Sequence, residues 1–356
     1  MKVAWRKRPA VVWVGFALIA LSLLALPFAL AQVGTSWVRI TNYAMLYVLL
    51  ALGLNIVVGF AGLLDLGYIA FYAVGAYTYA LLASPHFNLH LPFWVILPIG
   101  AAVAALFGVL LGTPTLKLRG DYLAIVTLGF GEIVRVFLNN LSRPVNITNG
   151  PQGIARIDPF TLGEFDFSRY QEFLGLMFSG PVKYYYLLLA VMLGIIVVNL
   201  RLQNSRIGRA WEAIREDEIA ARAMGINTRN LKLLAFAMGA SFGGVAGGMF
   251  SAIQGFISPE SFVLVESIMV VSMVVLGGMG NIWGVLVGAL LLSFVPEVLR
   301  WTVEPLQGAL FGRQLIEPEV IRMLIFGFAL VLIMLFRPAG LVPSAVRKRE
   351  LAERAA

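Results

Sequence analysis

Cysteine is missing from this chain of 356 residues, and histidine occurs only twice. Without cysteine there is no disulfide framework and no thiolate metal site. The two histidines, His86 and His90, share one short loop with no carboxylate nearby in the sequence. Interfacial histidines are therefore a better interpretation than a metal pair, and we predict that the chain has no metal site.

Two further absences concern chemistry. No lysine follows a glycine anywhere, so the Walker A motif is absent, and Gly277-Gly278-Met279-Gly280 is not a phosphate-binding loop. No carboxylate pair, no nucleophile with a base and no cluster of metal ligands has a spacing that supports catalysis. We therefore predict that the chain is not an enzyme and binds no cofactor of its own.

Charge is scarce as well, and long apolar runs take its place. Charged residues make up 13% and hydrophobic residues 60% of the chain, whereas soluble domains have about 25% and about 45–50%. About 20 residues cross a bilayer. The chain is thus predicted to be an all-α membrane protein, a polytopic bundle of about ten transmembrane helices. The expected spans lie near 10–32, 38–60, 63–83, 92–113, 121–139, 183–201, 231–252, 262–277, 283–301 and 319–336.

Basic residues predict the orientation. The first run resembles a signal peptide, but it is long enough to span and lacks a convincing cleavage site, so we treat it as a retained span. With both termini inside, the cytoplasmic segments hold most of the 27 Lys and Arg residues, as the positive-inside rule requires. The net charge of +8 is thus a signal of topology and not of nucleic-acid binding. These segments are 1–9, 59–63, 113–121, 201–231, 277–283 and 337–356.

The domain organisation follows from this topology. Residues 10–336 form the membrane domain, between a cytoplasmic N-terminus at 1–9 and a basic cytoplasmic tail at 337–356. The longest external segment, 140–182, exceeds the roughly 12–15 residues beyond which loops are usually functional. We expect it to form a binding surface or an external cap.

One polar stretch, 205–227, separates two very apolar ones. Its many charges give it no packing reason to lie in lipid, so we expect one or two short cytoplasmic helices. Small and apolar residues such as Ile214 and Met224 lie among the charges, which do not form a regular salt-bridge pattern. Such a surface suits docking into a partner's groove better than a solvated connector does.

Glycines recur at helical spacing. In lipid, small residues four apart let two helices approach closely, so we expect these glycines to pack helices together. They are Gly239, Gly243 and Gly247, and then Gly284 and Gly288.

Polar residues inside apolar spans are costly and tend to face a cavity or a partner. For Asp65 the alternative is a helix cap at an interface, and for Glu132 it is a pair with Arg135 on the same helix. A further carboxylate, Glu266, lies at the start of a later span. The candidates for a translocation path are Asn55, Asp65, Glu132 and Gln254.

Seven stretches follow one another from about residue 50 to 341 without a large gap. They are GLLDLGYIAFYAVGAYTYALL (62–82), LKLRGDYLAIVTLGFGEIVRVFLNN (116–140), TNGPQGI (148–154), NSRIGRAWEAIREDEIAARAMGIN (204–227), QGFISPESF (254–262), VVLGGMGNIWG (274–284) and FRPAGL (336–341). Together they resemble the LivM-type permease subunits of branched-chain amino-acid ABC importers.

The resemblance implies a permease in a bacterial or archaeal cytoplasmic membrane with several partners. These are a second, related permease subunit, two cytoplasmic ATPase subunits that use ATP and Mg, and a solute-binding protein outside. Segment 205–227 would dock onto an ATPase. The importer pattern there is Glu-Ala-Ala, three residues, then Gly, and Ile219 stands at the glutamate position. The coupling residues so implied are Arg209, Glu212, Ala213, Glu216, Glu218, Ala220, Ala221 and Gly225.

Three alternatives stay open at this point. The same machine could carry urea or short amides, whose permeases look similar. A stand-alone channel or proton-coupled carrier would need no docking helix. A membrane scaffold would transport nothing.

Overall fold

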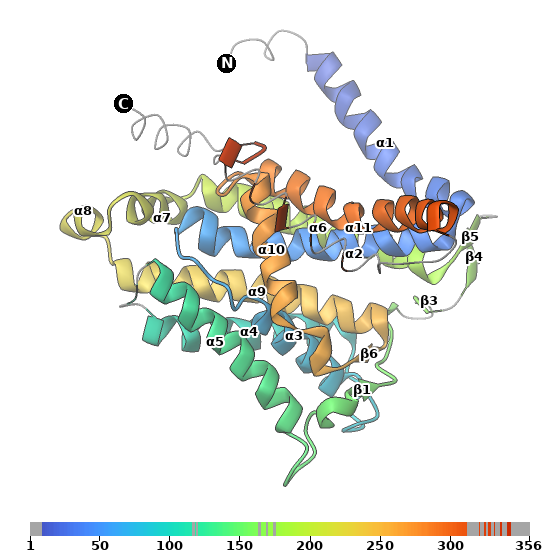
Figure 1. The fold of residues 1–356 in the computed structure, drawn as a ribbon, viewed down its shortest axis with the longest axis horizontal. Coiled ribbons are helices and arrows are strands. Elements are labelled where there is room, and N and C mark those ends of the chain that lie inside the picture. The colour runs from blue at the N-terminus through green and yellow to red at the C-terminus, as the bar shows by residue number, and fades with distance from the viewer. Residues whose placement is uncertain are drawn as a thin grey trace.

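A computed structural model describes residues 9–311 except 116, 117, 119, 163, 164, 169, 174 and 175, together with ten positions between 320 and 342. The described residues form a helical bundle (Figure 1). Its α-helices are α1 (Pro9–Val33), α2 (Thr35–Leu54), α3 (Ile69–Leu82), α4 (Phe93–Thr115), α5 (Asp121–Asn140), α6 (Gly180–Gln203), α7 (Arg206–Glu216), α8 (Glu218–Ala223), α9 (Thr228–Gln254), α10 (Leu264–Gly277) and α11 (Ile282–Phe311).

Shorter elements link these helices. A π-helix, η2 (Asn55–Phe60), continues α2, and two 3-10 turns are η3 (Gly150–Gln152) and η4 (Pro259–Ser261). Six short strands pair antiparallel as β1–β6, β2–β3 and β4–β5. Their bounds are β1 (Ile154–Ala155), β2 (Thr161–Leu162), β3 (Phe165–Asp166), β4 (Gln171–Phe173), β5 (Leu176–Phe178) and β6 (Phe256–Ile257).

The fold is that of a polytopic helical membrane protein. Within the described residues, six helices are long and apolar enough to cross a bilayer: Thr35–Phe60, Phe93–Thr115, Gly180–Gln203, Thr228–Gln254, Pro259–Gly277 and Ile282–Thr302. Ala20–Val33 and Ile69–Leu82 are shorter apolar helices. Helix α5 has 20 residues, as expected for the fifth span. Most of the expected span at 319–336 lies outside the described residues.

Helix α2 forms the centre of the bundle. Its residues from Ala44 to Leu54 are buried except for Tyr47, and α6, α9, α10 and α11 pack against this helix. Helix α9 packs against α3 and α4 through small residues, which allow the backbones to touch. A Cβ atom added to Gly75 would overlap Gly244, and one added to Gly108 would lie 2.7 Å from the Phe236 carbonyl oxygen.

The glycines expected to pack helices lie at such approaches. A Cβ added to Gly247 would overlap the Tyr72 carbonyl oxygen of α3, and one added to Gly239 would lie 2.5 Å from Val57. The neighbours of Gly243 leave more room, the nearest being Phe71 Cβ at 3.2 Å. At the α10–α11 contact, a Cβ on either Gly284 or Gly288 would overlap a carbonyl oxygen of α10.

The expectation of a continuous third span over 63–83 is wrong in its first turns. Residues 61–68 form no helix, and α3 begins only at Ile69. Backbone at membrane depth must find hydrogen bonds inside the protein. Here Leu66 N donates to Thr127 Oγ1 of α5 at 3.0 Å, and Ser267 Oγ of α10 donates to Leu66 O at 2.6 Å. Neighbouring helices thus stabilise the break.

One end of the bundle is closed by the segments expected outside. Strand β1 pairs with β6, and His86 Nε2 lies 3.2 Å from Asn146 O. His90 forms a hydrogen-bonded pair with Asp158. A carboxylate that is distant in sequence therefore accompanies one of the two histidines. Helices α7 and α8 lie at the opposite end of the long axis (Figure 1).

Candidate functional site

The polar segment 205–227 forms two short helices, α7 and α8, and a side-chain cap marks each helix start. Ser205 accepts from Gly208 N at 3.1 Å at the start of α7. Asp217 accepts from Ile219 N and Ala220 N at 2.7 and 3.0 Å, which ends α7 and begins α8. Asn227 then caps α9. Caps of this kind satisfy the free N–H groups of a first helical turn.

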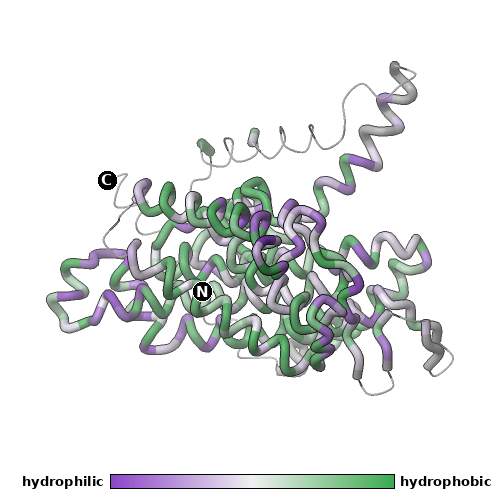
Figure 2. Tube along the Cα trace, turned by 90° about the horizontal axis from the view of Figure 1, so that it is seen from below, coloured by the Kyte–Doolittle hydropathy of each residue, from purple (hydrophilic) through white to green (hydrophobic). Residues whose placement is uncertain are grey.

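Helix α7 is fixed to the bundle along one side. Trp211 is fully buried, and its Nε1 donates to Leu231 O of α9 at 2.7 Å. Ile214 lies buried on the same side. Glu218 of α8 pairs with Lys232 at 2.8 Å and with Arg222 at 3.1 Å. The segment is therefore held to the base of α9. Figure 2 shows hydrophilic and hydrophobic residues alternating at this end of the molecule.

The opposite side of α7 and α8 is exposed. Met224 is 84% and Ile219 is 69% exposed, although both are apolar. Of the predicted coupling residues, Ala221 is buried, and Ala213 and Glu218 are half-buried against the bundle. The exposed ones are Arg209, Glu212, Glu216, Ala220 and Gly225.

The backbone of Gly225 has a left-handed φ of +83°. This glycine follows Met224, the C-cap of α8, and within the part of the chain that the structure describes no atom beyond its chain neighbours lies within 4 Å of an added Cβ. A side chain there would strain the backbone whatever the partner. Ile219 and Met224 are therefore better positions than Gly225 for testing contact with a partner.

Arg215, which the sequence did not single out, joins α7 to the end of the central helix. Its guanidinium donates to the Gly59 carbonyl oxygen of η2, 156 residues away in the chain. Gly62, which has a φ of +69°, packs on the Arg215 stem, because an added Cβ would lie 2.7 Å from Arg215 Cγ. The turn at 59–62 and the polar segment are thus in direct contact.

The four candidates for the translocation path do not come together. Asn55 is fully buried in η2, and its Oδ1 accepts from Gly280 N at 2.9 Å. Asp65 is fully buried in the break before α3 and accepts from Gly67 N at 2.9 Å. Both side chains therefore bind the chain's own backbone. In particular, Asp65 acts as a cap for its own turn.

Glu132 lies on the outer face of α5. It forms a bidentate pair with Arg135, one turn on, whose Nε lies 3.0 and 3.2 Å from the two carboxylate oxygens. Arg135 Nη1 also lies 3.2 Å from Glu260 of η4. The face beside Glu132 is an apolar groove of about 580 Å³, lined by Leu128, Gly129, Ile133, Val136, Phe137 and Asn140.

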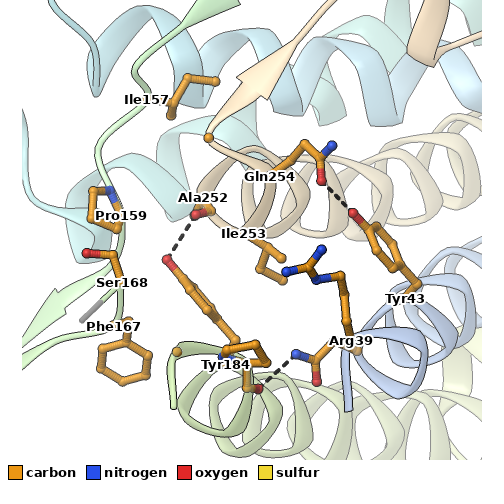
Figure 3. Close-up of a pocket in the computed structure, with 14 residues that line it drawn as sticks. Arg39, Tyr43, Ile157, Pro159, Phe167, Ser168, Tyr184, Ala252, Ile253 and Gln254 are labelled. Carbon is orange, nitrogen blue, oxygen red and sulfur yellow. Dashed lines mark hydrogen bonds between the residues drawn. The ribbon is translucent and has the colours of Figure 1, made fainter. Parts of the chain in front are cut away.

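Gln254 lies at the end of α9 opposite α7 and α8, in a pocket of about 510 Å³ between α2, α6, α9 and the segment 157–168 (Figure 3). The Tyr43 hydroxyl donates to Gln254 Oε1. Arg39 lies beside Tyr43 in the same wall. Deeper between the helices, the Tyr47 hydroxyl donates to Glu266 Oε2 of α10 at 2.8 Å. Gln254 therefore belongs to a polar wall that begins in α2.

Comparison with known proteins decides the family. The family described as "Branched-chain amino acid transport system / permease component" matches residues 36–335. The chain belongs to this family. It is 47% identical over 341 residues to "High-affinity branched-chain amino acid transport system permease protein LivM" of Escherichia coli K12, covering 92% of this chain and 74% of that protein. No solved structure matches the chain.

More distant relatives fall into two groups. The probable LivM permease of Methanocaldococcus jannaschii is 28% identical over 258 residues, covering 70% of this chain and 68% of that protein. The E. coli K12 permease LivH is 23% identical over 252 residues, covering 69% and 79%. LivM and LivH carry the same system name in E. coli. Two permeases of one system are therefore related to this chain.

These matches choose between the alternatives that the sequence left open. The chain is the permease component of a branched-chain amino-acid ABC transport system, and it is a multi-pass membrane protein without catalytic activity of its own. The readings as a urea permease, a stand-alone channel, a proton-coupled carrier or a scaffold are set aside.

Proposed function

We propose that this chain forms one half of the membrane pathway of an importer and docks an ATPase through α7 and α8. The observation that carries the docking role is the exposed pair Ile219 and Met224 on a segment anchored by Trp211. Exposed apolar side chains among charges are typical of docking surfaces, where apolar anchors provide affinity. The ATPase subunits bind and use ATP and Mg, and a solute-binding protein delivers the amino acid.

The same proposal places the protein in the cytoplasmic membrane of a prokaryote, with both termini inside. Three contacts support the proposal that these segments share the cytoplasmic side of the membrane. Arg215 of α7 contacts Gly59, Asn55 contacts Gly280, and Leu341 N donates to Leu276 O at 2.8 Å. The turns expected in the cytoplasm and residue 341, just beyond the last expected span, therefore lie together. Segment 140–182 lies at the other end, where a solute-binding protein would dock.

The docking role predicts a large effect of charge at the exposed pair. Ile219→Asp combined with Met224→Asp should lower substrate-stimulated ATP hydrolysis and uptake by roughly tenfold or more, because removing apolar anchors from an interface typically costs over 1–2 kcal/mol. The measurement is both activities in the reconstituted complex. Arg229→Ala, an exposed change on the same side, is the control and should leave both unchanged.

Folding is not at risk in that double variant, because both side chains are exposed in the single chain. A normal yield of the permease with both activities lost supports docking. Wild-type uptake in the double variant would show that the ATPase binds elsewhere.

We further propose that the outer face of α5 packs against the second permease and borders the path between the two subunits. A charged group at the centre of a bilayer costs about 2.5–3.5 kcal/mol, so such groups face a partner or water. Glu132 is 43% exposed in the single chain, beside an apolar groove. We therefore keep Glu132 as a proposed residue of the translocation path and add its partner Arg135 and Glu260, which Arg135 contacts.

A pair of glycines tests this interface without disturbing the subunit. Among the described residues, neither Gly129 in the α5 groove nor Gly194 on the outside of α6 has an atom from another part of the chain within 4 Å of an added Cβ. Gly129→Leu should lower co-purification of the second permease and uptake by roughly tenfold, since overpacking costs about 1–3 kcal/mol. Gly194→Leu should change neither. Equal behaviour of the two variants would place α5 against lipid.

A further inference from the structure

The pocket near Gln254 has two chemically different walls (Figure 3). On one side, Arg39 and Tyr43 of α2 and Gln254 of α9 present a guanidinium, a hydroxyl and an amide. On the other, Ile157, Pro159 and Phe167 come from the segment between β1 and α6, with Ser168 as the polar residue among them. A volume of about 510 Å³ falls in the range of small-molecule sites. One wall therefore suits a charged or polar end of a ligand, and the other wall suits an apolar end.

One group in the pocket has unused binding capacity. Arg39 is exposed and forms no ion pair with any residue that the structure describes. The pocket thus offers a cation for a carboxylate.

We infer that this pocket is a subsite for a free zwitterionic amino acid with an apolar side chain. The Arg39 guanidinium binds the carboxylate, and the wall of Ile157 and Phe167 contacts the side chain. Arg39 is suited to this role because its fork of donors matches a carboxylate in a bidentate manner. The hydrogen bond from Tyr43 holds the Gln254 amide at the edge of the site.

The position of the pocket indicates at which step of import the amino acid would bind there. This part of the inference rests on the proposed function. The pocket lies at the end of α9 opposite α7 and α8, on the side where a solute-binding protein would release its cargo. It is built within one subunit, apart from the α5 groove. An amino acid would therefore occupy it after release and before the path between the subunits.

The test measures binding of radiolabelled leucine to the complete transport complex without the solute-binding protein. Saturable leucine binding is expected. It should be competed by other branched-chain amino acids, but at least roughly tenfold less well by leucinamide, which keeps the ammonium group and lacks the carboxylate. Arg39→Ala should weaken leucine binding roughly tenfold, and Arg39→Lys should retain part of it. Arg143→Ala, an exposed arginine of the external segment that does not line the pocket, is the matched control.

Several results would overturn the subsite. They are no saturable leucine binding by the wild-type complex, equal competition by leucinamide, and unchanged binding in Arg39→Ala. If Arg39→Ala instead weakened only the association of the solute-binding protein, Arg39 would bind a carboxylate of that protein. The amount of ATPase that co-purifies with the permease reports docking through α7 and α8 independently of leucine binding, so a failure of the subsite is distinguishable from a failure of that docking.

Discussion

Gly247→Leu is expected to abolish transport by preventing α9 from packing against α3. A Cβ at position 247 would overlap the Tyr72 carbonyl oxygen and lie 2.6 Å from Ala76 N. Both obstacles are backbone atoms of a helix, which cannot rotate away as the end of a side chain can. Overpacking of a core already costs about 1–3 kcal/mol where side chains adjust. A leucine against backbone should cost more and separate the two helices.

The expected result is a loss of properly folded protein in detergent together with loss of uptake, measured by thermal unfolding and by transport in vesicles. Gly243→Leu should be milder, because its nearest neighbour is Phe71 Cβ at 3.2 Å. Gly194→Leu, on the outside of α6, is the control and should resemble the wild type. Wild-type stability and uptake with leucine at 247 would contradict the observed contact between α3 and α9.

The spacing of the glycines indicated that α9 has a packing face, but it did not say what packs there. A four-residue repeat is a property of one helix, whereas the partner depends on how distant segments meet. Gly247 meets the backbone of α3, and Gly239 meets Val57 at the end of α2. The apolar runs likewise predicted the long helices well, because length and hydrophobicity are properties of each run alone.

The non-helical break at 61–68 could not be predicted from length and hydrophobicity. Hydropathy treats Leu63 and Leu66 as part of an apolar span, yet the Leu66 backbone donates to Thr127 and accepts from Ser267, and these bonds support a non-helical backbone there. Residue type alone also did not show which of the four path candidates line a groove or a pocket. Asn55 and Asp65 are polar groups in apolar surroundings, but they bind backbone N–H groups of the chain itself. Glu132 and Gln254 are the two that line a groove or a pocket.

The helix caps of the polar segment could have been predicted from the sequence. Ser205, Asp217 and Asn227 each precede a helix, and residues of these types are favoured at that position. The contact between Arg215 and Gly59 could not have been predicted, since no local sequence feature distinguishes Arg215 from the other arginines of the segment. It joins a proposed docking helix to the end of the central helix, and so it defines a mechanical link.

Arg215→Ala should therefore uncouple ATP hydrolysis from transport. Helix α7 is anchored to α9 by Trp211, and Arg215 adds a connection to Gly59. Gly59 in turn lies against Gly280, the turn between α10 and α11. A hydrogen bond to a charged group contributes about 1.5–3 kcal/mol, so its loss should reduce amino acid moved per ATP by roughly tenfold. ATP hydrolysis should continue, because the docking face with Ile219 and Met224 is intact.

That combination separates this variant from the double aspartate variant, in which hydrolysis and uptake fall together. Arg215→Lys should recover part of the coupling, since a lysine keeps the charge and offers donors but lacks the planar fork. Arg206→Ala, exposed at the start of α7, is the matched control and should keep the wild-type ratio. If Arg215→Ala also kept that ratio, motion of α7 would reach the membrane helices through its other contacts, among them that of Trp211 with α9. The end of α2 would then follow α9 passively, through the contact of Gly239 with Val57.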